Sequence, residues 1–371
     1  MQFQIKRDTL LKSLNFAHNI IERKNTLPIL SNVLLEAKDK KLSIVATDLD
    51  LVFYDEITDL KIIKDGSTTT SATVLHDLLR KLTSNLDVTF NLKDENKLNI
   101  TAENSKFNLL CLPINNFPNF SDKFDNDGIS LNRKDFLSLL NKTKISMSND
   151  ETRHYLNGIY IHITEGNNKS YLTGVATDSH RLSSSSMKLS ENIKFKPFIL
   201  PKKTVFQLCS LLEDGDEKIL LFSSDTKVKF QMGNLKITSK VIDGKFPDYR
   251  KVVPSNNSKI LSVNVKDLIN SVERVITVSI DRKEGVKITL DKDNIQLFVN
   301  SSSSGEGKES IKASYNSEQF TVSFNSRYLL DIASEIEDEK IVAKLNDAVS
   351  PVLIQDNSDK QSFYVIMPMK I

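Results

Sequence analysis

Residues 43–48 read Ser-Ile-Val-Ala-Thr-Asp, and residues 174–178 read Gly-Val-Ala-Thr-Asp. Each stretch is an apolar, strand-forming run that ends in a polar Thr-Asp pair. An aspartate side chain readily accepts hydrogen bonds from the backbone N–H groups that follow it. Asp48 and Asp178 therefore predict the same tight turn at a strand end, and the recurrence indicates a repeated structural unit.

Two predicted helices recur around this motif. Apolar residues at helical spacing predict a first helix at residues 7–14, 133–140 and 265–272, each after a short strand. Thr9, Asp135 and Asp267 are candidate N-terminal caps for these helices. The same spacing predicts a second helix at residues 71–82, 201–212 and 325–336. The apolar faces of the second helices are expected to contain Leu75, Leu78, Leu79, Leu82, Phe206, Cys209, Leu212, Leu330, Ala333 and Ile336.

Each repeat closes with a strand and a proline, at Pro118, Pro247 and Pro368. Polar linkers near 121–128 and 253–258 separate the repeats. These features predict an α+β protein with three tandem domains at residues 1–122, 128–252 and 258–371. Each domain is expected to pack two helices against antiparallel strands.

The composition is that of a globular protein, with 371 residues, of which 39% are hydrophobic and 26% charged. No apolar run is long enough to span a bilayer, and the first residues do not resemble a signal peptide. Cys111 and Cys209 lack metal-like spacing and are expected to be free thiols, which favours a cytoplasmic location. Because the net charge is only +2, a nucleic-acid partner would require segregated basic charge.

Basic residues concentrate on the predicted helices of the first two repeats. Phosphate contacts made by such side chains are independent of base sequence and sensitive to salt. The alternative interpretation is an ordinary solvated helix face. The candidate phosphate contacts from this pattern are Arg7, Lys12, Arg80, Lys142, Lys202 and Lys203.

A metal-dependent hydrolase is the main competing class, with Asp178 and His180, or Asp48 and Asp50, as ligands. The sequence has no His pair four residues apart, no glycine-rich phosphate loop and no nucleophile elbow. We therefore predict no catalytic residue, no metal and no cofactor. A third class is a ring-shaped adaptor that binds proteins but not DNA.

At the level of longer motifs, the whole chain resembles the bacterial beta sliding clamp family, the processivity subunits of the replicative DNA polymerase III holoenzyme. The motifs are TLPIL at 26–30, TDL at 47–49, FPNF at 117–120, RHYLNG at 153–158, VATDSHRL at 175–182, TSKVIDGKFPDYR at 238–250 and YVIMPM at 364–369. The resemblance implies a DNA clamp fold that dimerises head to tail into a six-domain ring around duplex DNA. It also implies that the protein is a non-catalytic tether for other proteins during DNA replication.

The resemblance extends to partners and interfaces. Its implied partners are duplex DNA, a second copy of the chain, the replicative polymerase catalytic subunit, the clamp loader complex, and repair and translesion polymerases. It places Phe107 and Leu109 against Thr277 and Val278 of the other copy at the dimer interface. It adds Lys24, His154 and Tyr155 to the DNA contacts.

Partners of this family bind a groove through a short peptide. The residues at the matching positions are Leu156, Thr177, Ser179, His180, Arg181, Leu182, Pro247, Lys251, Val252, Asn325, Tyr328, Val349, Pro351, Val365, Met367, Pro368 and Met369. The apolar members are expected to hold the anchor side chains, and Arg181, His180 and Asn325 to orient the peptide backbone. The chain departs from the family pattern at Ser179, Thr277 and Lys283.

Overall fold

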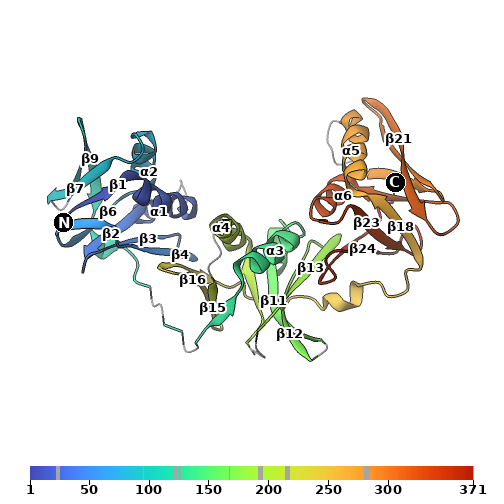
Figure 1. Cartoon of the computed structure of the whole chain (residues 1–371), viewed down its shortest axis with the longest axis horizontal. Helices are drawn as coiled ribbons and strands as arrows, with labels where there is room; N and C mark the ends of the chain where they lie inside the picture. The colour runs from blue at the N-terminus through green and yellow to red at the C-terminus, as the bar shows by residue number, and fades with distance from the viewer. Residues whose placement is uncertain are drawn as a thin grey trace. The chain divides into compact units, whose positions relative to one another are not determined.

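A computed structural model describes residues 1–21, 26–94, 96–120, 123–124, 127–166, 168–190, 195–213, 218–279 and 285–370. Lys24 and Lys283 lie outside the described residues. The chain forms two compact units, one of Met1–Lys134 with Phe206–Val241, and one of Asp135–Val205 with Ile242–Ile371 (Figure 1).

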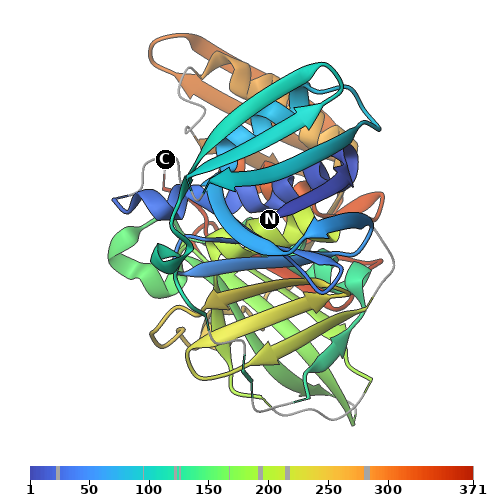
Figure 2. The same cartoon turned by 90° about the vertical axis from the view of Figure 1, so that its left-hand side faces the viewer.

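The first unit is built on one antiparallel sheet in the order β10-β15-β16-β17-β4-β3-β2-β6-β9-β8-β7-β1-β5. Its strands are β1 (Gln2–Lys6), β2 (Asn32–Lys38), β3 (Lys41–Thr47), β4 (Leu51–Ile57), β5 (Leu60–Lys64), β6 (Gly66–Ser71), β7 (Asp87–Asp94), β8 (Lys97–Ala102), β9 (Ser105–Leu112), β10 (Ile129–Leu131), β15 (Ile219–Ser223), β16 (Lys227–Met232) and β17 (Leu235–Lys240). Helices α1 (Arg7–Ile20) and α2 (Ala72–Lys81) lie side by side against this sheet (Figure 2). The buried stripe Leu10, Leu14 and Ala17 of α1 has the spacing that predicted this helix.

The second unit holds the other antiparallel sheet, in the order β14-β11-β12-β13-β25-β24-β23-β18-β21-β20-β19-β22. Its strands are β11 (Gly158–Gly166), β12 (Lys169–Thr177), β13 (Arg181–Lys188), β14 (Phe198–Pro201), β18 (Lys259–Asn264), β19 (Gly285–Leu290), β20 (Asn294–Ser301), β21 (Gly305–Tyr315), β22 (Phe320–Asn325), β23 (Lys340–Leu345), β24 (Val352–Asp356) and β25 (Ser362–Ile366). Helices α5 (Val265–Val275) and α6 (Ser326–Ala333) contact each other in this unit. Helices α3 (Arg133–Lys144) and α4 (Lys202–Leu212) each contain residues of both units.

The six predicted helices are present, and the antiparallel sheets confirm the α+β class. Two details of the prediction were wrong. Thr9 and Asp267 are not caps, because α1 and α5 begin two residues before them; α5 is capped by Asn264, which accepts a hydrogen bond from the Asp267 N–H at 3.1 Å. Phe206 is 47% exposed, whereas Cys209 and Leu212 are buried as predicted and Val205 and Leu208 are buried beside them. None of the helices in the described ranges is long and apolar enough to cross a membrane.

Candidate partner-peptide groove and DNA-facing residues

The turn between β12 and β13 is fixed by its own side chains. The Thr177 hydroxyl donates to the Arg181 carbonyl at 2.7 Å and accepts from the Ser179 N–H at 3.1 Å. The Asp178 carboxylate accepts from the His180 and Arg181 N–H groups, both at 2.9 Å. Ser179 has a φ of 77°, a conformation that favours glycine. The predicted aspartate turn is therefore confirmed, and Ser179 is the residue of this turn that has a left-handed backbone conformation.

The first repeat contains the same turn between β3 and β4. Asp48 accepts from the N–H groups of Asp50 and Leu51 at 2.9 and 2.7 Å, and Leu49 has a φ of 79°. Of the carboxylates named in the hydrolase alternative, Asp48 and Asp178 therefore accept hydrogen bonds from backbone N–H groups, and Asp50 pairs with Lys240 at 2.9 Å. Across the described residues, no cluster of three or more His, Cys, Asp or Glu side chains is arranged to hold a metal ion.

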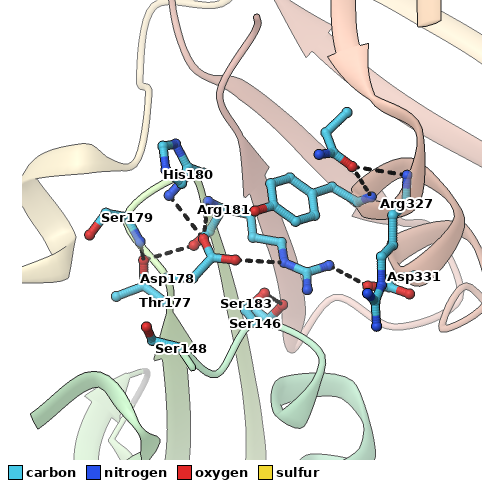
Figure 3. Close-up of polar contacts among 12 residues, drawn as sticks. Ser146, Ser148, Thr177, Asp178, Ser179, His180, Arg181, Ser183, Arg327 and Asp331 are labelled. Atoms are coloured by element: carbon cyan, nitrogen blue, oxygen red, sulfur yellow. Dashed lines mark hydrogen bonds and ion pairs between the residues drawn. The ribbon is translucent and has the colours of Figure 1, made fainter. Parts of the chain in front are cut away.

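Arg181 is held in a buried network beside this turn (Figure 3). Its guanidinium donates to Asp178 at 3.1 Å and to Asp331 of α6 at 2.6 Å, and its central carbon lies 4.2 Å from the centre of the Tyr328 ring. Burial, and then the nearby Asp178 charge, raises the pKa of Tyr328. The network joins the turn to α6 and fixes the orientation of Arg181.

Asn325 caps a helix beside the groove. Its side-chain oxygen accepts hydrogen bonds from the N–H groups of Arg327 and Tyr328 at 3.0 and 3.3 Å, which caps the N-terminus of α6. The cap uses the amide oxygen, whereas the amide nitrogen is a donor of the kind that a peptide carbonyl accepts. The predicted role of Asn325 in orienting a peptide stays a prediction.

A groove of about 240 Å³ opens beside the turn. Its lining residues are Leu156, Thr177, Ser179, His180, Arg181, Leu182, Pro247, Asp248, Tyr249, Val252, Val365 and Met367. Ten of them are residues that the sequence placed in the peptide groove. Leu182 pairs with Val365 across β13 and β25, so residues far apart in the sequence form one apolar floor.

The remaining predicted groove residues lie outside this lining. Lys251 is exposed and pairs with Asp248 at 3.4 Å, and Val349 and Met369 are also exposed. Pro351 and Pro368 do not line the cavity either. Sequence reasoning missed Asp248 and Tyr249, although the recurring Phe-Pro-X-aromatic motif at 117–120 and 246–249 was the signal that marked them.

Tyr249 is supported from behind by a buried aromatic stack. Its hydroxyl lies 3.0 Å from Nε2 of His162, which stacks on Tyr160 with ring centres 4.7 Å apart, and Tyr160 stacks in turn on Phe246 at 4.9 Å. Burial, followed by the Arg250 charge, lowers the pKa of His162 to about 4. His162 is therefore neutral near pH 7 and packs as an aromatic group under one wall of the groove.

The side chains around Lys142 and Arg7 argue against two of the candidate phosphate contacts. The ammonium of Lys142 lies 2.7 Å from Glu337 and 2.8 Å from Asp359, and its side chain is only 7% exposed. Arg7 donates to the carbonyls of Leu79 and Arg80 at 2.7 and 2.9 Å and pairs with Asp8. The two carboxylates neutralise the charge of Lys142, and the guanidinium of Arg7 is bound by groups within the protein. We therefore do not retain either residue as a candidate DNA contact.

The other candidates differ in their exposure. Lys12 on α1 and Arg80 at the end of α2 are exposed, and Arg80 lies 3.6 Å from Asp77. Lys202 and Lys203 are partly exposed at the start of α4, where Lys202 donates to Asn149. All four side chains are therefore at least partly accessible to solvent.

His154 and Tyr155 form an edge-to-face pair with ring centres 5.9 Å apart. His154 is exposed, and its Nε2 lies 3.0 Å from the Asp243 carbonyl. Nearby, hydrogen bonds from Thr152 and Arg153 lower the pKa of Asp150 to about 2. The pair presents an aromatic surface of the kind on which bases stack, and the nearby Asp150 carboxylate is paired with Arg153 at 2.8 Å.

The predicted dimer residues lie at a strand edge and at a helix end. Phe107 and Leu109 are half-buried on β9, where residues 105–110 pair with β8. Val278 is partly buried, and the Thr277 hydroxyl donates to the Arg274 carbonyl at 2.7 Å just after α5. In the described parts of the chain, residues 106–110 have a strand partner on one side only.

Comparison with known proteins agrees with this geometry. The profiles of the DNA polymerase III beta subunit match at residues 1–121 for its N-terminal domain, 130–248 for its central domain and 250–370 for its C-terminal domain. The beta sliding clamp of Caulobacter vibrioides is 37% identical, with 100% of both chains covered. That of Escherichia coli K12 is 31% identical, also over 100% of both chains.

Solved structures show the same similarity. The Bartonella birtlesii sliding clamp bound to griselimycin superposes with a TM-score of 0.96 at 38% identity and full coverage of both chains. The Caulobacter crescentus clamp, with polyethylene glycol at the region proposed to tether the beta motif, has a TM-score of 0.95 at 36% identity, with 100% of this chain and 99% of that chain covered. The chain belongs to the bacterial DNA polymerase III beta subunit family, the non-catalytic sliding clamps of DNA replication.

Proposed function

We propose that two copies of this chain close into a ring around duplex DNA and hold replication proteins there through the groove of the second unit. The observation that carries this proposal is the groove itself, whose lining brings together ten predicted residues from four separate stretches of the sequence. Its occupants would be short peptides of the replicative polymerase catalytic subunit, the clamp loader and the repair and translesion polymerases. We place this function in the cytoplasm, where bacterial DNA is replicated.

The chemistry of the groove suits a peptide with an apolar anchor. Leu156, Leu182 and Val365 are buried and form the floor, whereas Val252 and Met367 are exposed at its rim. A flexible methionine at the rim adapts to different anchor side chains. The rigid Arg181 network supplies fixed polar groups beside this apolar floor, which favours one peptide orientation.

DNA would be held by charge rather than by base recognition. Lys12, Arg80, Lys202 and Lys203 supply cations without the rigid, buried geometry that base reading requires. Such contacts release counterions and weaken as salt rises. His154 and Tyr155 add a stacking surface for an unpaired base.

Closure of the ring would use the strand edges of two chains. An edge with unpaired backbone groups is a favourable site for pairing with another chain. The one-sided edge of β9, with Phe107 and Leu109, supports this use. The surface near Thr277 and Val278 is the proposed partner in a head-to-tail dimer, a contact that forms a ring when the rotation closes.

The decisive experiment uses topology. The protein is loaded onto nicked circular DNA by its clamp loader, washed in high salt, and the DNA is then cut once. A closed ring stays on the circle through the wash and leaves after the cut, because it is linked to the DNA and not merely attracted to it. Release from both forms in moderate salt would contradict encirclement, and absence from DNA with an active loader would favour a protein-only adaptor.

A further inference from the structure

A second and larger cavity, of about 640 Å³, lies on the sheet of the first unit where β4 pairs with β17. We call it the lysine-lined groove, because Lys227, Lys236 and Lys240 all contribute to its lining. The aspartate turn of the first repeat and the segment Phe117–Phe120 form another part of the lining. Nothing in the proposed peptide binding or DNA contacts uses this cavity.

The lysine-lined groove has the same construction as the peptide groove. Val52 pairs with Thr238 across β4 and β17, and Leu182 pairs with Val365 across β13 and β25 at the equivalent register. Two residues after Thr238, the Lys240 N–H donates to the Asp50 carbonyl at 2.8 Å. Two residues after Val365, the Met367 N–H donates to the His180 carbonyl at 2.9 Å. The internal repeat has therefore produced two cavities at equivalent strand junctions.

The two cavities differ in the chemistry of these equivalent positions. Where the peptide groove has Val365 and Met367, the lysine-lined groove has Thr238 and Lys240. Its charged lining contains three lysines against the two carboxylates of Glu36 and Asp50, which leaves one net positive charge. A segment that binds here would meet polar and charged side chains at positions where the peptide groove offers apolar surface.

The lining of the cavity also contains apolar surface. Leu49, at the left-handed position of the turn, is 41% exposed, and Phe120 is 39% exposed. Tyr54 lines the cavity beneath Lys236, whose ammonium lies 4.9 Å from the ring centre. Large, exposed apolar side chains that converge on a hollow are typical of a site for an anchor side chain.

The ion pair at the rim is exchangeable. Lys240 lies 2.9 Å from Asp50, and both side chains are largely exposed. Exposed pairs of this kind contribute little to stability because water screens them. A carboxylate of a bound peptide can therefore share or replace Asp50 at Lys240 at small cost.

We propose that the lysine-lined groove is a second peptide-docking site of the clamp, and that it takes an extended acidic segment carrying an anchor of two adjacent large apolar side chains. The apolar anchor would contact Leu49 and Phe120, and the acidic residues would contact Lys236 and Lys240. Partners that carry such a segment would then dock without competing for the peptide groove. This inference concerns a separate site and goes beyond the proposed function.

Fluorescence anisotropy with a fluorescein-labelled hexapeptide, EDLFED, tests the proposal on the full-length protein. We expect saturable binding that weakens about ten-fold or more in the double variant Lys236→Glu, Lys240→Glu, because hydrogen bonds to charged groups are lost and repulsion replaces them. The matched control is Val252→Asp, which alters the rim of the peptide groove and should leave the affinity unchanged. Lys236→Gln with Lys240→Gln serves as a milder second variant, and melting temperatures verify that all variants fold.

Two further peptides separate a groove from a general basic surface. EDGGED keeps the charges and removes the anchor, and KRLFKR keeps the anchor and reverses the charges; both should bind at least ten-fold more weakly than EDLFED. Equal binding of EDGGED, no saturable binding of EDLFED, or a larger loss in Val252→Asp than in the lysine variants would each overturn the proposal. Retention of the loaded ring on circular DNA is measured separately, so failure of this second site is distinguishable from failure of the clamp function.

Discussion

Single residues in the second unit derive their roles from burial. Arg181 and Lys142 carry the same formal charge as many surface residues, but each is enclosed by carboxylates from distant parts of the chain. His162 is the opposite case, because it is buried with no carboxylate partner among the described residues and contacts Tyr160 and Tyr249. The structure therefore uses buried cations to join elements and a neutral histidine to support the groove wall.

The lowered pKa of His162 predicts a pH dependence of stability. The unfolded chain protonates this histidine near pH 6.5, whereas the folded protein does so near its pKa of about 4. Between these values the unfolded state binds the extra proton, so stability falls as the pH falls from about 6.5 to about 4, by up to about 3 kcal/mol. His162→Gln should cost stability at pH 7 and remove this contribution.

Urea titrations of the parent protein and His162→Gln at pH 7 and pH 5 measure the effect. The gap between the two midpoints should narrow at pH 5, because only the parent protein pays the cost of a buried, titrating histidine. Midpoints that fall in parallel would contradict the assignment. Because the two proteins are compared at the same pH, the contribution of their shared carboxylates to the pH dependence of stability cancels.

At the scale of elements, the strand-end turns and the helix caps connect local sequence to the groove. The Thr-Asp turn has the same hydrogen bonds in both units. The threonine and aspartate side chains bond backbone groups that lie no more than four residues further along the chain. Helix α6 is short, and its N-terminus is capped by Asn325. Because α6 carries Tyr328 and Asp331, the stability of this helix controls the position of Arg181.

Removal of the cap should loosen α6. We expect Asn325→Ala to destabilise the helix by about 1 kcal/mol, because the N–H groups of Arg327 and Tyr328 lose their acceptor. Hydrogen exchange at these two amides should accelerate in Asn325→Ala. Asn325→Asp keeps a capping oxygen and should exchange like the parent protein; equal acceleration in both variants would show that the cap is not the cause.

At the scale of the whole molecule, the proposed function depends on assembly. The edge of β9 is paired on one side along residues 106–110, and Leu110 beside it is the most exposed of the large apolar residues in the described chain. An edge of this kind needs a covering partner to remain soluble. The proposed head-to-tail dimer would supply that cover.

A charge at this edge should open the dimer. We expect Leu109→Asp to shift the protein from dimer to monomer in sedimentation velocity, because the carboxylate would be buried against the partner without a cation. Ile63→Asp is the control, because Ile63 is an exposed apolar residue on another strand of the first unit. A Leu109→Asp variant that remains dimeric, or an Ile63→Asp variant that dissociates equally, would argue against β9 as the interface.

Features that depend on residues close together in the chain could be predicted from the sequence. The repeated strands, the six helices and the aspartate turns were all predicted, because helical spacing, strand patterning and side-chain-to-backbone hydrogen bonds act over a few residues. The family motifs also located most of the groove lining. The cap of α5 was predicted at the wrong residue, because Asn264 caps this helix and lies three residues before Asp267.

The availability of each charge and the positions of the cavities depend on contacts between distant segments and could not be predicted from the sequence. Lys142 and Asp359 are 217 residues apart in the sequence, so no local pattern distinguishes Lys142 from an exposed lysine such as Lys12. Val365 enters the groove because β13 pairs with β25, and the lysine-lined groove exists because β17 pairs with β4. Charge is a property of the residue, but its solvation and its partners are set by contacts between distant segments, and these contacts follow from the complete fold.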